Sequence, residues 1–267
     1  MPRVLPLALP TFALPLAALL LLFGLGGALV ASLLKAPPAQ HTLAAFSTSL
    51  QGRNRNQRLN ADLAARSING RIIPPNGVFS FNRTVKSWSV DQGYVKALVS
   101  YDGELVRAYG GGVCQTSTTL YNAALLAGLP IVERHPHVFV PHYIAPGRDA
   151  AVAFPGVDLR FRNPHPWPIR IRARVRGERL EVALSGAAKV PSKVRIESEM
   201  LSMTLPQRLT RVVSRRENSK GRSYLHSAGA AGYRVVTYRV ASSGRREWLS
   251  DDTYPAMNRI IALNRSE

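Results

Sequence analysis

The sequence predicts an α+β fold, in which a few helices pack on an antiparallel or mixed sheet, with a small β-rich C-terminal extension and an N-terminal transmembrane helix. Strand signals are separated along the chain and show no regular strand–helix alternation, which argues against a doubly wound sheet. A long apolar run lies near the N-terminus, and polar loops with paired strand signals begin beyond Val190. We therefore expect a membrane anchor or signal segment over residues 1–36, a Pro-rich spacer over 37–42, a main domain over 43–188 and the extension over 189–267.

The apolar run predicts attachment to a membrane. No charged residue occurs between Arg3 and Lys35, and Leu16–Leu34 contains no proline. At about 1.5 Å per residue this stretch spans roughly the 30 Å hydrocarbon thickness of a bilayer. A cleaved signal peptide is the alternative, although its apolar region is usually shorter. We expect a single-pass protein with its C-terminal part outside the cytoplasm, or a secreted protein if the segment is cleaved.

Composition restricts the classes of partner and of site that this protein can have. Lys and Arg total 35 against 16 Asp and Glu, so the formal net charge of +19 favours an anionic partner. For an extracytoplasmic domain, that partner is expected to be an anionic envelope polymer or lipid headgroups, and not nucleic acid. The single cysteine, Cys114, excludes a disulfide framework within the chain and a Cys-based structural zinc site.

Periodicity and turn residues predict the main elements. Apolar spacing predicts one helix over residues 57–69, stopped by Gly70, and another over 115–127, stopped by Gly128. Alternation and flanking turns predict strands over residues 78–81, 169–175, 179–184, 233–240 and 245–249. The first of the longer strands alternates Ile and Arg, which is typical of a sheet with one wet, basic face.

The segment Gly110-Gly111-Gly112-Val113-Cys114 predicts a reactive thiol. Glycines allow the backbone to approach a ligand closely, and the cysteine stands where a helix is expected to begin. Free N–H groups and the positive end of the helix dipole favour a thiolate there. The alternative is a small buried hydrophobic residue.

A nucleophilic thiol needs a base that a third group orients. His135 and His137 are the candidate bases, with Asp149 or Glu133 fixing the imidazole tautomer. A metal site made from these histidines, His142 and Cys114 has no known ligand spacing, so we expect no metal and no cofactor.

Substrate contacts are expected around the same segments. Arg134 and Arg148 are expected to bind a carboxylate, or else to form ion pairs with Glu133 or Asp149. Backbone N–H groups from Val113 to Gln115 are expected to hold an oxyanion. The remaining residues expected at the substrate site are Gly111, Gly112, Gln115 and Ser117.

Several separated motifs resemble the VanW family, named after a vancomycin-resistance accessory protein. They are residues 110–123, 133–137, 147–152 and 158–163, and the resemblance covers residues 43–173. Two departures are Val138, where a serine often follows the second histidine, and Asn76-Gly77, which replaces Gly-Glu. Residues 229–262 are faintly similar to the G5-type β extension found beside many such domains.

The resemblance implies a protein of the bacterial cell membrane that acts on peptidoglycan stem peptides. The family is similar in role to L,D-transpeptidases that carry a cysteine nucleophile, which implies a thioester on Cys114 with His137 or His135 as the catalytic histidine. Two alternatives remain open at this point: a carboxypeptidase that uses water as acceptor, and a non-catalytic peptidoglycan-binding or accessory protein.

Overall fold

The computed structural model describes residues 41–101, 104–189, 194–213 and 223–264. The predicted membrane segment lies outside these residues. No helix within the described ranges is both long enough and apolar enough to cross a membrane.

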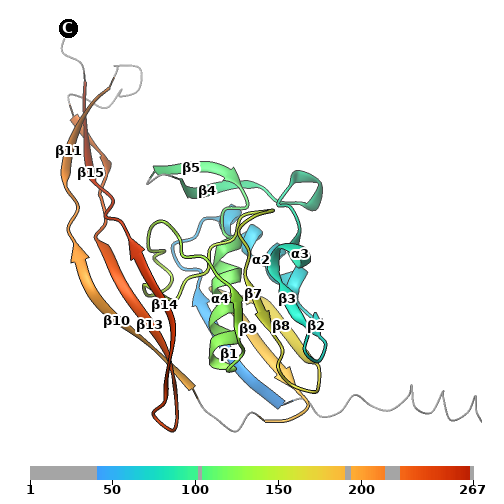
Figure 1. Ribbon diagram of the computed structural model, residues 1–267. Helices are drawn as coiled ribbons and strands as arrows, with labels where there is room; N and C mark the ends of the chain where they lie inside the picture. Colours follow the sequence, from blue (N-terminus) through green and yellow to red (C-terminus); the bar gives the residue numbers. More distant parts are fainter. Residues whose placement is uncertain (1–40, 102–103, 190–193, 214–222, 265–267) are drawn as a thin grey trace, which may run out of the picture. The chain divides into compact units, whose positions relative to one another are not determined.

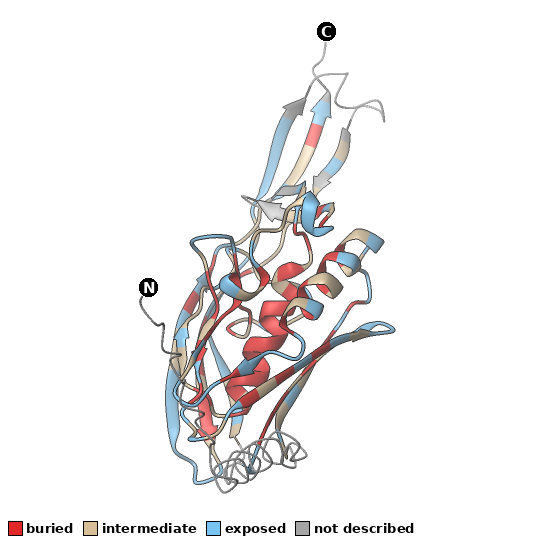
Figure 2. Cartoon of the chain, turned by 90° about the vertical axis from the view of Figure 1, so that its right-hand side faces the viewer, coloured by how far each residue is buried: buried red, intermediate tan, exposed pale blue. Residues whose placement is uncertain are grey.

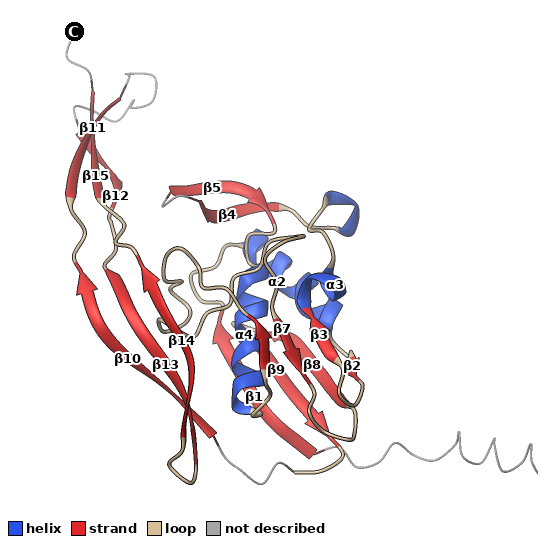
Figure 3. Ribbon diagram, viewed as in Figure 1, coloured by secondary structure: helices blue, strands red, loops and turns tan. Residues whose placement is uncertain are grey.

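The described chain is mostly sheet with few helices, as the α+β prediction required (Figures 1 and 3). The largest sheet of the main domain is antiparallel with the order β1-β9-β8-β2, and a smaller antiparallel sheet has the order β3-β7-β6. A hairpin of β4 and β5 stands apart from both. These strands are β1 (His41–Ser49), β2 (Ile72–Ile73), β3 (Val78–Ser80), β4 (Lys96–Tyr101), β5 (Glu104–Tyr109), β6 (Ile131–Glu133), β7 (Arg160–Arg162), β8 (Ile169–Arg176) and β9 (Arg179–Gly186).

Helices α2 (Arg55–Ile68) and α4 (Val113–Leu126) pack against the large sheet and against each other. Helix α2 begins at a capping box, in which the side chains of Asn54 and Gln57 each accept a hydrogen bond from the other's backbone N–H, at 2.9 and 3.2 Å. Helix α4 is buried along almost its whole length (Figure 2). The core therefore lies between α4, α2 and the sheet. The short helix α3 (Phe81–Val85) adds Phe81 and Val85 to it, whereas η1 (Val90–Gln92) has no buried residue.

Strand β8 confirms the predicted basic face. Ile169, Ile171 and Ala173 are buried against the helices, whereas Arg172 and Arg174 between and beyond them are exposed. The period of two places every second side chain in the core, so the arginines of this strand reach solvent without being buried.

The residues after β9 form two three-stranded sheets. One has the antiparallel order β10-β13-β14, and the other has the order β11-β15-β12, in which β11 pairs parallel with β15. The strands are β10 (Val194–Thr204), β11 (Arg208–Val213), β12 (Ser223–Ser227), β13 (Gly232–Ala241), β14 (Arg246–Tyr254) and β15 (Arg259–Asn264). The two strands predicted in this region correspond to β13 and β14, which are longer than expected.

Two predicted boundaries need correction. The helix expected from Gln115 begins at Val113, so Cys114 lies inside its first turn. Phe81, expected to end a strand, instead begins α3, because the Ser80 hydroxyl accepts the Arg83 N–H at 3.1 Å and caps a helix there.

Gly111 and Gly112 pack closely against the backbone of neighbouring elements. A Cβ on Gly111 would lie 2.7 Å from the Leu98 carbonyl oxygen, and one on Gly112 would lie 2.2 Å from the Gln57 carbonyl oxygen. Gly112 also has φ of +111°, a conformation that favours glycine. The triplet therefore allows the start of α4 to pack directly on the backbone of β4 and α2.

Gly112→Ala is expected to destabilise the fold by at least ~2 kcal/mol, because it adds overpacking against Gln57 to backbone strain. Gly128→Ala is the matched control: it stands at the other end of α4 with φ of +74° and has no atom within 4 Å of the added Cβ. Strain alone predicts a cost of about 1–2 kcal/mol there. Urea unfolding of both variants measures the difference, and equal losses would contradict the packing role of Gly112.

Candidate thiol site

Cys114 is the second residue of α4 and is partly exposed. The helix has Gly112 as its N-cap and no side-chain cap, so no capping side chain competes for its first N–H groups. The Cys114 Sγ lies 3.4 Å from the carbonyl oxygen of Val152, on the loop that follows Asp149. The thiol is thus placed at the positive end of the helix dipole, as the sequence predicted.

His137 faces this thiol. Its backbone N–H and its ring Nδ1 both lie 2.6 Å from Asp149 Oδ2, so two hydrogen bonds to one oxygen fix the ring. With Nδ1 bound to the carboxylate, Nε2 is the ring nitrogen left to interact with Cys114, whose proximity raises the pKa of His137. Cys114, His137 and Asp149 therefore form one row.

His135 lies elsewhere. Its ring Nε2 lies 3.0 Å from Glu133 Oε1, and its side chain is 44% exposed against 22% for His137. Its backbone carbonyl accepts the Ala151 N–H at 2.8 Å. Of the two histidines that the sequence left as alternatives, the geometry brings only His137 to Asp149. Glu133 is correspondingly held by His135 and is not part of the row.

Asp149 is completely buried, and all its interactions are with the protein. Its Oδ1 accepts hydrogen bonds from Arg134 Nη2 at 3.0 Å and from the Tyr254 hydroxyl at 2.6 Å. Arg134 also donates from Nε to the Asp149 carbonyl oxygen at 2.7 Å and from Nη1 to Asp252 Oδ1 at 2.6 Å. The carboxylate that orients His137 is therefore held by a cation and a hydroxyl.

Tyr254 and Asp252 both lie on β14, in the segment that the sequence analysis predicts as the C-terminal extension. Sequence reasoning missed them, because they lie more than a hundred residues from Asp149 and carry no motif spacing that links them to it. Further bonds join β13 to the main domain, from Arg239 Nη2 to the Leu129 carbonyl oxygen at 2.7 Å and from Thr237 Oγ1 to the Gly147 carbonyl oxygen at 3.3 Å.

Burial, hydrogen bonds and neighbouring charges shift the pKa values of Cys114, His137 and Asp149. Burial alone raises the pKa of the Cys114 thiol, but the hydrogen bond with His137 and the charge of its ring bring that pKa below its ordinary value. Burial alone lowers the pKa of His137, whereas the hydrogen bonds with Asp149 and Cys114 raise it to about 9. Burial raises the pKa of Asp149, but His137 and Arg134 together hold it below its usual range. These directions favour a thiolate–imidazolium pair beside a carboxylate.

Several residues expected to contact substrate are buried and bonded within the fold. The Gln115 side chain accepts from Arg53 Nε at 3.1 Å and donates to the Ser49 carbonyl oxygen at 2.7 Å. The Ser117 hydroxyl donates to the Ala150 carbonyl oxygen at 2.6 Å. Both side chains are almost inaccessible to solvent, and their hydrogen bonds are made within the fold.

Some of the backbone N–H groups expected to hold an oxyanion already donate hydrogen bonds within the protein. The Val113 N–H donates to the Gly110 carbonyl oxygen at 2.9 Å, and the Gln115 N–H donates to the Gly112 carbonyl oxygen at 3.1 Å. These two bonds close the turn into α4. Two of the three expected backbone donors therefore stabilise the helix start.

The two arginines with an expected carboxylate role differ. Arg134 forms the ion pair with Asp149 that was one alternative, and its side chain is only 6% exposed. Arg148 forms no ion pair among the described residues; its Nε donates to Asn122 Oδ1 at 2.8 Å, and its guanidinium lies over the Phe46 ring.

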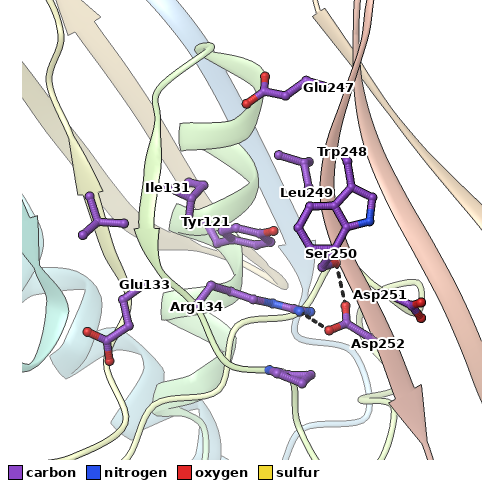
Figure 4. Close-up of a pocket in the computed structure, with 12 residues that line it drawn as sticks. Tyr121, Ile131, Glu133, Arg134, Glu247, Trp248, Leu249, Ser250, Asp251 and Asp252 are labelled. Carbon is purple, nitrogen blue, oxygen red and sulfur yellow. Dashed lines mark hydrogen bonds and ion pairs between the residues drawn. The ribbon is translucent and has the colours of Figure 1, made fainter.

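A cavity of about 400 Å³ lies between β6 and β14, above the Arg134–Asp252 ion pair (Figure 4). Trp248 and Pro136 line it together with four carboxylates. Each carboxylate already has a basic partner in the protein, and Cys114 does not line the cavity. The described residues contain no cluster of three or more His, Cys, Asp or Glu that could hold a metal ion.

Fold and site together define an α+β domain that carries a cysteine–histidine–aspartate row at the start of a buried helix. Residues 56–185 match the family described as VanW like protein, so the chain carries a domain of that family over these residues. It is 38% identical over 153 residues to "Uncharacterized protein YoaR" of Bacillus subtilis (strain 168), a match over 57% of this chain and 50% of that protein. It is 36% identical over 114 residues to "Vancomycin B-type resistance protein VanW" of Enterococcus faecalis (strain ATCC 700802 / V583), over 40% of this chain and 41% of that protein. The chain thus matches half or less of the length of these relatives.

Two solved structures are similar to a part of the chain. The "IgA1 Protease G5 domain structure" is 17% identical with a TM-score of 0.20, and covers 29% of this chain and 96% of that one. "HP0197-G5" is 27% identical with a TM-score of 0.15, and covers 27% of this chain and 93% of that one. At these TM-scores neither likeness supports an argument, and the G5-like character of the extension stays a prediction.

The His137 ring is expected to keep its proton up to about pH 9, which NMR titration of its ring resonances can follow. In Cys114→Ala, the pKa of His137 is expected to fall, because the thiolate is one of the groups that raise it. The ring of His135 in the same spectra provides an internal comparison. An unchanged His137 titration in the variant would contradict the contact between thiol and imidazole.

Tyr254→Phe is expected to lower the free energy of unfolding by about 1–3 kcal/mol, since it removes one hydrogen bond from each of two buried groups. These groups are Asp149 Oδ1, which loses one of its donors, and the Gly147 N–H, which donates to the Tyr254 hydroxyl at 2.9 Å. Tyr233→Phe is the matched control, because Tyr233 lies directly opposite Tyr254 on β13 and its hydroxyl has no partner among the described residues. Equal losses in urea unfolding would contradict the support of Asp149 by Tyr254.

Proposed function

We propose that this protein is a membrane-anchored cysteine acyltransferase of the bacterial envelope, acting on peptidoglycan stem peptides. Cys114 is the nucleophile, His137 is the general acid and base, and Asp149 orients the imidazole. Arg134 and Tyr254 hold Asp149 in place without touching the substrate.

The single observation that carries the proposal is the geometry of His137. Both its N–H and its Nδ1 bind one oxygen of a fully buried carboxylate, and the same imidazole lowers the pKa of the thiol at the helix start. A carboxylate that fixes the tautomer of an imidazole, which in turn activates a nucleophile, is the arrangement that acyl transfer through a covalent intermediate requires.

The reaction proceeds in two steps. The Cys114 thiolate attacks a peptide carbonyl carbon, and His137 gives its proton to the leaving amine as the C–N bond breaks and a thioester forms. The amine of a neighbouring stem then attacks the thioester and gives its proton to His137, and the C–S bond breaks. Water in place of the amine gives hydrolysis by the same residues, which is the carboxypeptidase alternative.

The proposed location at the membrane is inferred from the sequence. The uncharged run from Leu16 to Leu34 is proposed to hold the domain at the outer face of the membrane, unless it is cleaved as a signal peptide. The basic charge of the chain suits anionic polymers or lipid headgroups at that location. The similarity to the vancomycin B-type resistance protein of Enterococcus faecalis supports a link to vancomycin resistance.

Incubation with purified muropeptides tests the function directly. Wild-type protein is expected to gain the mass of an acyl group on Cys114 and to release a terminal amino acid, whereas Cys114→Ala does neither. Asp149→Asn is expected to slow acylation by several orders of magnitude, because the wrong tautomer of His137 is favoured.

Unchanged product from Cys114→Ala would contradict the nucleophile assignment. Saturable binding to sacculi with no acyl-enzyme and no turnover would instead favour a non-catalytic accessory protein. Release of the terminal residue without cross-linked product would identify hydrolysis.

A further inference from the structure

Arg53 is a half-buried cation at the thiol site that has no carboxylate partner among the described residues. It follows β1 and precedes α2, and sequence analysis did not single it out. Its Nε donates to Gln115 Oε1 at 3.1 Å, and its guanidinium carbon lies 4.8 Å from the centre of the Tyr143 ring. Its terminal nitrogens have no protein partner within the described ranges.

The contacts of Arg53 fix the orientation of its side chain. Gln115 is itself held by bonds to Thr48 Oγ1 at 3.0 Å and to the Ser49 carbonyl oxygen at 2.7 Å, so the acceptor for Nε is fixed. The guanidinium also lies over the Tyr143 ring, which gives Arg53 a second contact on one face. An arginine anchored through Nε and one face keeps its two terminal nitrogens available as a fork for a planar anion.

The contrast with Arg134 shows that the charge of Arg53 is not balanced by the fold. Burial lowers the pKa of Arg53, and the groups that oppose this effect are Tyr143 and Cys114, not carboxylates. Burial also acts on Arg134, yet Tyr121, Asp149 and Asp252 bring its pKa above the ordinary value. The fold supplies Arg134 with two carboxylates, whereas Arg53 is anchored on Gln115, the residue after the thiol, and has none among the described residues.

We propose that Arg53 binds the terminal carboxylate of the acyl donor, on the leaving-group side of the bond that Cys114 attacks. The inference rests on the proposed function and adds a specificity to it: donors with a free C-terminal carboxylate one residue beyond the reacting carbonyl are preferred. A terminal carboxylate is ionised at neutral pH, and a guanidinium binds it through two parallel hydrogen bonds.

Arg148 is a weaker candidate for this role, although it also has no carboxylate partner among the described residues. Its anchor, Asn122, lies eight residues after Cys114, which is about 12 Å along the helix axis. Arg53 is anchored by the residue next to the thiol.

Alkylation of Cys114 by iodoacetate and by iodoacetamide tests the inference without the natural substrate. The two reagents deliver similar groups to the thiol, but only iodoacetate carries a carboxylate. Both second-order rate constants are measured on the full chain in neutral detergent at one pH, and their ratio is divided by the ratio for free cysteine. The ratio is needed because Arg53 also favours the thiolate, an effect that changes both rates together.

Arg53→Gln is expected to lower the iodoacetate-to-iodoacetamide ratio about tenfold, the equivalent of one charge-assisted hydrogen bond. Arg53→Lys keeps the charge but not the fork, and its ratio is expected to lie between those of wild type and Arg53→Gln. Arg66→Gln is the matched control: it removes the same charge from α2, at an exposed position paired with Asp62. Its ratio is expected to equal that of wild type.

An unchanged ratio in Arg53→Gln would overturn the inference and leave Cys114 as a nucleophile. An equal fall in Arg66→Gln would also overturn it, because net charge would then explain the preference. If neither reagent labels folded wild-type protein, both the inference and the nucleophile assignment fail. Circular dichroism melting confirms that each variant is folded, and Arg53→Lys provides a second reading should Arg53→Gln unfold.

Discussion

The buried carboxylate of Asp149 is the interaction on which the rest of the site depends. An ionised carboxylate without solvent is costly unless charges and donors compensate it. Here Oδ2 accepts the His137 N–H and ring Nδ1, while Oδ1 accepts Arg134 and the Tyr254 hydroxyl. The same four bonds that make the buried charge tolerable also fix the ring that faces Cys114, so the stability of the network and the orientation of the imidazole cannot be separated.

Because Asp149 needs these partners, the C-terminal strands contribute residues to the site. Strand β14 supplies Tyr254 to Asp149 and Asp252 to Arg134, so the carboxylate and its counter-ion are both completed from outside the segment that matches the family. The Arg134 side chain, with two carboxylates around it, is committed to this network. Arg53 differs because no carboxylate among the described residues balances its charge, and its Nε donates to Gln115, the residue after Cys114.

The local parts of this arrangement could be predicted from sequence, and the long-range parts could not. Glycines before a helical run predicted Cys114 at a helix start, and the alternation of Ile and Arg predicted the two faces of β8. The glycines predicted a close approach of the backbone, but the sequence could not show that Gly112 approaches Gln57 of α2. Nor could spacing separate His135 from His137, since the loop and not a strand sets which ring meets Asp149. Tyr254 and Arg53 were missed because each reaches the site only through tertiary packing.

The most direct test of the account is the pH dependence of Cys114 alkylation by iodoacetamide in the folded protein, since thiolate is the reacting species. The account predicts an apparent pKa below the value of about 8.5 for a free thiol, and a rise of that pKa above it in His137→Ala, where burial acts unopposed by the imidazole. An apparent pKa at or above the free-thiol value in wild type, or labelling only after unfolding, would contradict it and return Cys114 to the role of a buried structural residue.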